Sequence, residues 1–279
     1  IRLSNPLVYF IPTPIGNLED ITLRTIRTLE EVDYIAAEDT RHTIKLLNHL
    51  NIKKPLISLH EHNEAFKSKE LIELITSGHD VALVSDAGMP GISDPGEKLI
   101  KQCIESEVEV VTLPGPSAFI TALVNSGLDT SRFTFIGFLD RNNKTRKETI
   151  EALKARQETL IFYEAPHRIE KTISELFEVL GDRKIVIARE PTKKYEQYIR
   201  TSLKSLSEDF SMLEHRGEMV IILEGAIEEV EPEINKEAVE KRIKELLLQD
   251  LSTKEVAKQI AIEYKIKKND AYALALGIK

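Results

Sequence analysis

Three short segments rich in proline and glycine could form a binding site for a small molecule. They are TPIGN (13–17), SDAGMPGISDPG (85–96) and LPGPSA (113–118). Glycine lets the backbone approach a ligand closely and proline fixes its shape, so such segments leave carbonyl and amide groups free for contacts. Each follows an apolar run of strand type, and the carboxyl ends of parallel strands meet at one edge of a sheet. A turn alone would explain any one segment, but the three together predict a cofactor crevice.

The motifs of several other ligand-binding and catalytic sites are absent from the sequence. It contains no GxGxxG, GxSxG, HExxH or CxxC string. Gly91 and Gly96 have the spacing of a phosphate-binding loop, but Glu97 stands where that loop needs a lysine and would repel phosphate. His60 and His62 are two residues apart, so on a strand both would face the same side and could bind one metal ion. No third or fourth ligand follows at the spacing of a zinc site. We therefore expect no bound metal.

Strand-like apolar runs alternate with helical patterns along most of the chain. LVYFIP precedes the helical pattern DITLRTIRTLEEV, and further pairs of this kind follow. The alternation predicts βα units and a mostly parallel sheet in an α/β fold. We expect an N-terminal α/β domain over 1–116, a second α/β domain over 117–226 and a small helical extension over 235–279. In this extension Ser252 and Glu255 have the spacing of a capping box.

Composition and charge favour a soluble protein of a reducing compartment. The 279 residues carry a net charge of -8, 42% of them are hydrophobic, and Cys103 is the one cysteine. No run has the length and apolarity of a membrane span and no secretion signal is recognised, so we expect a cytoplasmic protein without membrane contact. Basic residues outnumber acidic ones by six to two in 141–156 and by seven to two in 183–204. Each stretch is explained by a solvated helix face or by a surface that contacts RNA phosphates.

Seven distinctive strings occur in the sequence in a fixed order. They are TPIGNLEDITLR, AAEDTRHT, HEHNE, VALVSDAGMPGISDPG, LPGPSA, FYEAPHRI and AREPTKKYE. In this order and spacing they resemble the ribosomal RNA small subunit methyltransferase I family, which belongs to the tetrapyrrole methylase superfamily. The resemblance covers about residues 7 to 225. Met89 and Pro191 depart from the family pattern, in which threonine and leucine are usual, but neither replaces a charged motif residue.

The resemblance implies a fold and a cofactor. The fold has two α/β domains of tetrapyrrole-methylase type with a cofactor cleft between them, and the cofactor is S-adenosylmethionine. The positions that match the superfamily's binding pattern are Pro14, Asp86, Gly88, Gly91, Ile92, Ser117, Ala118, Phe162, Tyr163, Arg189 and Met219. Backbone groups of the glycine-rich segment would hold the amino acid part of the cofactor. Asp86 either approaches its cationic groups or only forms an Asx turn.

The resemblance also implies a substrate, the 2′ oxygen of a cytidine ribose in the decoding centre of small-subunit (16S) ribosomal RNA. The partner is then this RNA or the assembled small subunit, and a homodimer is the usual state of the superfamily. Because a ribose hydroxyl is weakly acidic, a nearby base or electrostatic stabiliser is expected to help it react. We predict this role for Glu190 and Lys193, with Arg41 pairing a phosphate or the oxyanion. The predicted RNA contacts are His42, His60, His62, Arg141, Lys144, Arg146, His167 and Arg168.

Alternatives remain open for both residues and function. His60 and His62 could instead support a hydrogen-bond lattice around EDTR (38–41), and His167 and Arg168 could simply cap the next helix. A methylase of a small ring or of a protein side chain is disfavoured by the basic stretches and by the AAEDTRHT and HEHNE strings. A ribosome-assembly factor without catalysis is disfavoured by the three intact loops.

Overall fold

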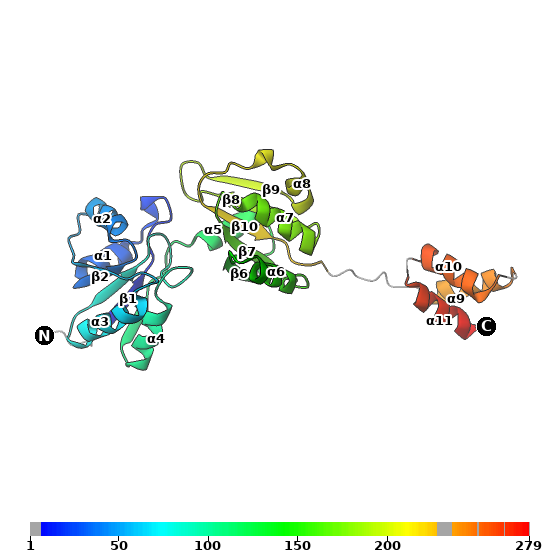
Figure 1. Ribbon diagram of the computed structural model, residues 1–279, viewed down its shortest axis with the longest axis horizontal. Coiled ribbons are helices and arrows are strands. Elements are labelled where there is room, and N and C mark those ends of the chain that lie inside the picture. Colours follow the sequence, from blue (N-terminus) through cyan, green and yellow to red (C-terminus); the bar gives the residue numbers. More distant parts are fainter. Residues whose placement is uncertain (1–6, 228–235, 250, 265, 279) are drawn as a thin grey trace. The chain divides into compact units, whose positions relative to one another are not determined.

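The computed structural model of the chain describes residues 7–227, 236–249, 251–264 and 266–278. The chain divides into two compact units, residues 1–226 and 227–279. The first unit contains two five-stranded sheets and the second contains helices only in its described residues (Figure 1). No helix in these ranges is long and apolar enough to cross a membrane. The predicted start of the helical extension, residue 235, lies outside the described residues.

The first sheet is parallel throughout, as the alternation of strand and helix patterns predicts. Its strand order is β3-β2-β4-β1-β5. The strands are β1 (Leu7–Ile11), β2 (Tyr34–Ala37), β3 (Leu56–Ser58), β4 (Val81–Val84) and β5 (Glu109–Thr112). The helices are α1 (Leu23–Glu31), α2 (Thr40–His49), α3 (Glu64–Thr76) and α4 (Glu97–Glu105), with a 3-10 turn η1 (Leu18–Asp20).

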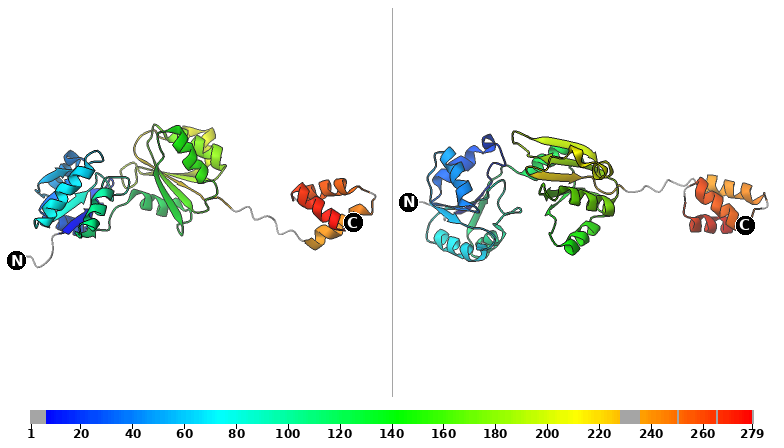
Figure 2. Two further views of the ribbon diagram at one scale, coloured as in Figure 1. Left: turned by 60° about the horizontal axis from the view of Figure 1, so that its bottom comes forward. Right: turned by 45° about the horizontal axis from the view of Figure 1, so that its top comes forward.

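Helices cover both faces of this first sheet. Leu29 of α1 and Leu47 of α2 belong to the core on one face. Leu71 of α3 and Leu99 of α4 belong to the core on the other, where the two helices lie side by side (Figures 1 and 2). Burial on both faces explains why the strands read as continuous apolar runs. The chain becomes polar only where it leaves a strand, so candidate functional side chains gather at strand ends.

The second sheet is mixed rather than parallel. Its order is β6-β7-β10-β8-β9, and only β6 and β7 pair in parallel. The strands are β6 (Phe133–Phe138), β7 (Thr159–Glu164), β8 (Lys184–Arg189), β9 (Gln197–Ser202) and β10 (Met219–Leu223). The helices are α5 (Ala118–Ser126), α6 (Asn143–Ala152), α7 (Ile169–Leu180) and α8 (Leu203–Glu208), with a 3-10 turn η2 (Phe210–Met212). The last strand, β10, therefore lies in the middle of the sheet, antiparallel to β7 and β8. Repeated βα units would instead make every strand parallel.

Two cores hold the helices on the second sheet. Side chains of α6, α7 and α8, such as Ile150, Ile173 and Leu206, form the larger one. Ala122 and Leu123 of α5 pack on the opposite face. The segment before α5 is LPGPSA, so this helix connects the third glycine- and proline-rich loop directly to the second sheet.

The second unit consists of α9 (Lys236–Leu247), α10 (Thr253–Glu263) and α11 (Lys268–Ile278). Val239, Ile260 and Ala275 are three members of its own apolar core. The predicted capping box is confirmed, because the Ser252 side chain accepts the N–H of Glu255 and the Glu255 carboxylate accepts the N–H of Ser252. The acidic segment 228–235 that precedes α9 lies outside the described residues.

Candidate active site

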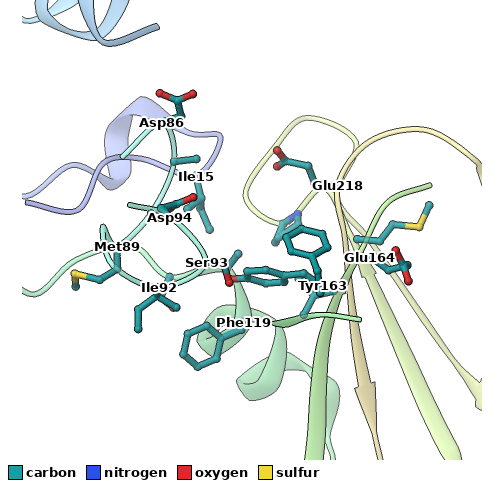
Figure 3. Close-up of a pocket in the computed structure, with 18 of the residues that line it drawn as sticks. Ile15, Asp86, Met89, Ile92, Ser93, Asp94, Phe119, Tyr163, Glu164 and Glu218 are labelled. Atoms are coloured by element: carbon teal, nitrogen blue, oxygen red, sulfur yellow. The ribbon is translucent and has the colours of Figure 1, made fainter. Parts of the chain in front are cut away.

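A cavity of about 450 Å³ lies in the first unit and takes its lining from loops of both sheets. Figure 3 shows Ile15, Asp86 and Asp94 on one side of it and Tyr163 and Glu218 on the other. The lining on the first side comes from segments that follow β1, β2 and β4, and on the second side from the ends of β6, β7 and β10. The cavity therefore forms at strand ends, where the sequence predicts a crevice.

The three glycine- and proline-rich segments meet at Gly88. The N–H of Thr13 donates to the Gly88 carbonyl and the N–H of Gly88 donates to the Thr13 carbonyl, each over 3.0 Å. A β-carbon on Gly88 would lie 3.3 Å from Cγ2 of Ile15 and 3.7 Å from the carbonyl oxygen of Pro116. Gly88 has a φ of +82°, which favours glycine. Its lack of a side chain therefore lets the three segments approach one another.

The second segment is held in place by a buried carboxylate from a different helix. Glu64, on α3, is 5% exposed. Its Oε1 accepts the N–H of Gly96 over 2.8 Å and the N–H of Lys98 over 3.0 Å, and these amides open helix α4. Within the loop, the N–H of Gly91 donates to the carbonyl of Pro95. These bonds fix the loop that carries Asp94 into the cavity.

Three carboxylates, Glu38, Asp86 and Asp94, form an acidic wall of the cavity. Burial raises the pKa of Asp94 to about 7, and the charges of Glu38 and Asp86 add to this effect. Burial also raises the pKa of Glu38, with Asp86 as its strongest charged neighbour. Like charges that crowd one another in a partly apolar cavity favour the protonated form. The wall is therefore suited to a cationic ligand.

Aromatic and aliphatic side chains line the opposite part of the cavity. The rings of Phe119 and Phe135 stack with centroids 4.4 Å apart, and Tyr163 contacts Phe135 and Phe138 at 5.0 and 5.5 Å. Burial raises the pKa of Tyr163 to about 12, so its hydroxyl stays protonated at neutral pH. Met219 extends this surface from β10. Such a wall can hold a flat aromatic group.

Most of the residues predicted to bind the cofactor line this cavity. They are Asp86, Gly88, Ile92, Ser117, Ala118, Tyr163 and Met219. Gly91 shapes the loop with a φ of +82° without lining the cavity. Pro14 lines a separate, smaller cavity of about 150 Å³ together with His42 and Asp86.

Two of the predicted cofactor contacts are wrong for this structure. Phe162 and Tyr163 are consecutive on β7, so their side chains point to opposite faces of the sheet. Phe162 is fully buried in the core under α6 and α7. Arg189 forms an ion pair with Glu214 at 2.6 Å and donates to the carbonyl of Arg216 at 2.9 Å. Its guanidinium therefore holds loops of the second sheet together and does not line the cavity.

Glu190 and Lys193 lie beside the cavity rather than in it. The Lys193 ammonium contacts Glu190 at 3.0 Å and Glu218 at 2.9 Å, and Glu218 itself lines the cavity. Partial burial lowers the pKa of Lys193, but its bonds to the two carboxylates outweigh this and raise the pKa. Burial raises the pKa of Glu190, but the Glu218 N–H and the Lys193 ammonium outweigh this and lower it. These shifts favour an electrostatic role over proton transfer, and the catalytic role of both residues stays a prediction.

The loop that carries these residues also contacts the first segment. Glu190 and Thr192 adopt φ values of +50° and +67°, which are strained for residues other than glycine. A β-carbon on Gly16 would collide with the aliphatic part of Lys193. Arg41 is separate from this cluster, because its side chain is 88% exposed and pairs with Asp39. That pairing lowers the pKa of Asp39 to about 2, and a phosphate contact by Arg41 stays a prediction.

The predicted RNA contacts separate into exposed residues and residues with internal roles. Arg146 was predicted to bind RNA, but it is 2% exposed and forms ion pairs with Glu164 and Glu175 inside the second sheet's core. Arg168 pairs with Glu164 at 3.3 Å and donates to the carbonyl of Leu139. Both arginines therefore stabilise the fold, and the prediction for Arg146 is wrong. The residues that remain accessible for an RNA contact are His42, His62, Arg141, Lys144 and His167.

His60 is partly buried beside the acidic wall. Its ring lies 6.0 Å from that of His62 in an edge-to-face arrangement, and its Nδ1 has no hydrogen-bond partner. A charge on His60 lowers the pKa of Glu38, against the larger effect of burial, which agrees with a supporting role for His60 beside that carboxylate. No group of three or more histidine, cysteine or acidic side chains in the described ranges could hold a metal ion.

Sequence reasoning missed several residues that line the cavity. Glu38 lies in the AAEDTRHT string and Asp94 in the SDPG string, and both strings are in segments that follow predicted strands. That position after a strand could have indicated that both carboxylates reach the crevice. Glu218 and Phe138 come from the mixed sheet, whose strand order the sequence does not reveal. Met89 lines the cavity as well, although it was noted only as a departure from the family pattern.

Comparison with known proteins places the chain in a family. Residues 7–207 match the family described as Tetrapyrrole (Corrin/Porphyrin) Methylases. The chain is 46% identical over 277 residues to the ribosomal RNA small subunit methyltransferase I of Haemophilus influenzae, covering 97% of this chain and 96% of the relative. The relative of the same name from Synechocystis sp. is 42% identical, and 98% of each chain is covered. This chain belongs to the ribosomal RNA small subunit methyltransferase I family. The resemblance read from its motifs is therefore confirmed.

Solved structures confirm the fold that this family membership implies. The methyltransferase CobJ superimposes with a TM-score of 0.60 at 19% identity, covering 80% of this chain and 95% of CobJ. The crystal structure of diphthine synthase gives a TM-score of 0.61 at 17% identity, covering 78% and 90%. The predicted tetrapyrrole-methylase architecture with a helical extension is confirmed.

Proposed function

We propose that this protein is an S-adenosylmethionine-dependent methyltransferase that modifies small-subunit ribosomal RNA. The observation that carries the proposal is the cavity at the strand ends, in a chain whose near-full-length relatives are named ribosomal RNA small subunit methyltransferase I. We further propose that the acceptor is the 2′ hydroxyl of a cytidine ribose in the decoding centre.

The lining of the cavity fits the proposed cofactor. Its size and its apolar side chains, including Phe119 and Met219, suit an adenosine. The acidic wall of Glu38, Asp86 and Asp94 suits a ligand with cationic ammonium and sulfonium groups. When bound, S-adenosylmethionine supplies an activated methyl group. The protein's part is then to align the acceptor, exclude water and receive a proton.

Exposed basic residues on the second sheet's side support an RNA acceptor. Arg141 and Lys144 lie at the start of α6 and are exposed, the Lys144 side chain by 86%. His167 is exposed beyond the end of β7, next to cavity residues Ala165 and Pro166. Contacts of these side chains with phosphates or with a flipped base would hold the acceptor near the cavity. A homodimer and a cytoplasmic location stay predictions from the family resemblance.

Tritiated methyl transfer tests the proposed function. The protein is incubated with labelled S-adenosylmethionine and purified small ribosomal subunits that lack the modification, and the RNA is mapped by nuclease digestion. We expect label in an alkali-resistant dinucleotide, because a 2′-O-methyl group blocks alkaline cleavage at that position. Absence of label despite cofactor binding, with transfer to a corrin precursor instead, would support a small-molecule methylase.

The double substitution of Arg141 and Lys144 by glutamine is expected to weaken binding to small-subunit RNA. Each lost phosphate contact should reduce the slope of log affinity against log salt by about 0.7 to 0.9. The melting temperature should not change, because both side chains are exposed. Filter binding at several salt concentrations measures the slope. Lys69→Gln, at an exposed lysine of α3, is the matched control, and an equal loss in that control would contradict a contact at α6.

A further inference from the structure

The acidic wall contains carboxylates that the rest of the protein leaves without a cationic partner. Among the described residues, no lysine or arginine forms an ion pair with Asp94 or Glu38. The other carboxylates that line the cavity are engaged. Glu164 pairs with arginines and Glu218 with a lysine, and Asp86 accepts the N–H of Asp39 over 3.1 Å. Within the part of the chain that the structure describes, Asp94 and Glu38 therefore face the cavity without an ion-pair partner.

Asp94 is the better placed of these two. It lies on the loop between β4 and α4, which Glu64 fixes through the amides of Gly96 and Lys98. Its neighbour Ser93 has a φ of 63°, a left-handed conformation that turns the backbone just before Asp94. Figure 3 shows Asp94 on the side of the cavity opposite Tyr163, whose pKa is raised by burial first and also by the charge of Asp94. Glu38 directly follows β2 in the chain.

We propose that Asp94 is the residue that accepts the proton of the acceptor hydroxyl. This role rests on the proposed function. The O–H bond of the ribose breaks and its proton passes to the Asp94 carboxylate. The oxygen forms a bond to the methyl carbon, and the electron pair of the breaking C–S bond stays on sulfur. The proton then leaves to solvent, so no other reactant is needed.

The surroundings tune Asp94 for this task. An ordinary aspartate is a weak base at neutral pH, but burial and the charges of Glu38 and Asp86 raise the pKa of Asp94 to about 7. The nearby Ser85 hydroxyl, which donates to the Gly88 carbonyl over 2.8 Å, acts in the opposite direction and lowers this pKa. A base with a pKa near the working pH transfers protons most effectively. Other ionisable groups near this cluster are Tyr163 and Glu164 from β7 and Glu218 from the start of β10, with Asp39, His60 and Glu61 beside Glu38.

Asp94→Asn tests the proposal, because the amide keeps the shape of the carboxylate and cannot accept the proton. We expect the rate of transfer at saturating substrates to fall by about a hundredfold or more. Binding of S-adenosylhomocysteine, which lacks the methyl group and the sulfonium charge but keeps the ammonium, measures separately how much cofactor affinity the variant loses, so that the rate is compared at true saturation. Asp129→Asn is the matched control, since the Asp129 carboxylate accepts bonds from the N–H and the hydroxyl of Ser131 in an exposed turn. A transfer rate in Asp94→Asn close to that of the wild type overturns the role.

The dependence of the rate on pH separates a proton acceptor from a structural residue. The wild-type rate should fall below about pH 7, where Asp94 becomes protonated. Glu38→Gln removes the largest charge that raises this pKa, so the fall should move to lower pH. An unchanged profile in Glu38→Gln overturns the proposal. Absence of label with the wild type overturns both this role and the proposed function, whereas label in the wild type and in Asp94→Asn alike overturns this role alone.

Thermal unfolding gives a readout that needs neither cofactor nor RNA. The pKa of Asp94 rises from 3.8 to about 7 on folding, so the folded state holds more protons than the unfolded state between these values. Stability therefore falls as pH rises through this window and then stays level. Asp94→Asn should reduce this fall and raise the melting temperature at pH 8 by several degrees. An identical fall in the variant contradicts the environment on which the proposal depends.

Discussion

Arg146→Met is expected to lower the free energy of unfolding by about 3 kcal/mol, the lower end of the range for breaking a buried ion pair, because Glu164 loses one of its two arginine partners and keeps Arg168. Arg146 and Glu164 are each 2% exposed. The Arg146 guanidinium contacts Glu164, Glu175 and the hydroxyl of Thr172. Methionine fills a similar volume but offers no donor to Glu164. Urea unfolding followed by circular dichroism measures the loss.

A comparison on the same helix isolates the cause of this loss. Lys144→Met changes an exposed residue two positions earlier, and we expect a change within about 0.5 kcal/mol. The double variant Arg146→Met/Glu164→Gln removes the buried charge that has lost one of its two arginine partners and should recover part of the stability. If Lys144→Met and Arg146→Met unfold alike, Arg146 is not the internal partner that the structure shows.

Helical periodicity could have predicted from the sequence that Arg146 is buried, whereas a count of charges could not. The string RNNKTRKE reads as one basic stretch, but Arg146, Ile150 and Leu153 are four and three residues apart and share one helix face. That face is buried. Charge summed over a segment therefore predicted an RNA surface, whereas the spacing assigns the accessible charge to Lys144 and its neighbours.

The same reasoning applies to β7, where period-two alternation separates Phe162 from Tyr163. The superfamily pattern supplied both positions as cofactor contacts, yet the side chains of consecutive strand residues point to opposite faces of the sheet. The structure places Tyr163 in the cavity and Phe162 in the core. Alternation could have made this choice from the sequence alone.

The acidic wall could not be predicted in this way, because it depends on strand order. Glu38 follows β2 and Asp86 follows β4, and these strands are neighbours although β3 lies between them in the sequence. Glu218 likewise reaches the cavity because β10 inserts beside β7. The parallel first sheet, the three converging loops and the capped helical unit follow from local patterns. The pairing of distant strands, which brings the carboxylates together, does not.

Gly88→Val is expected to weaken binding of S-adenosylhomocysteine by about tenfold or more, a cost of about 1.4 kcal/mol that is within the range of backbone strain. Valine is strained at a φ of +82°, and its β-carbon would lie 3.3 Å from Cγ2 of Ile15. To relieve this contact, either the first segment, which is hydrogen-bonded to Gly88 at Thr13, or the third segment at Pro116 has to move. All three segments line or shape the cavity, so the binding surface changes. Isothermal titration calorimetry measures the affinity.

Gly127→Val separates the loss of the binding surface from backbone strain alone. Gly127 ends α5 with a φ of +77°, and nothing lies within 4 Å of a β-carbon placed there. Both variants should lose stability to a similar extent, because the backbone strain is similar. Only Gly88→Val should lose affinity. Equal affinities in the two variants would mean that the contact of the three segments at Gly88 does not shape the cofactor site, and the cavity would then tolerate movement of its loops.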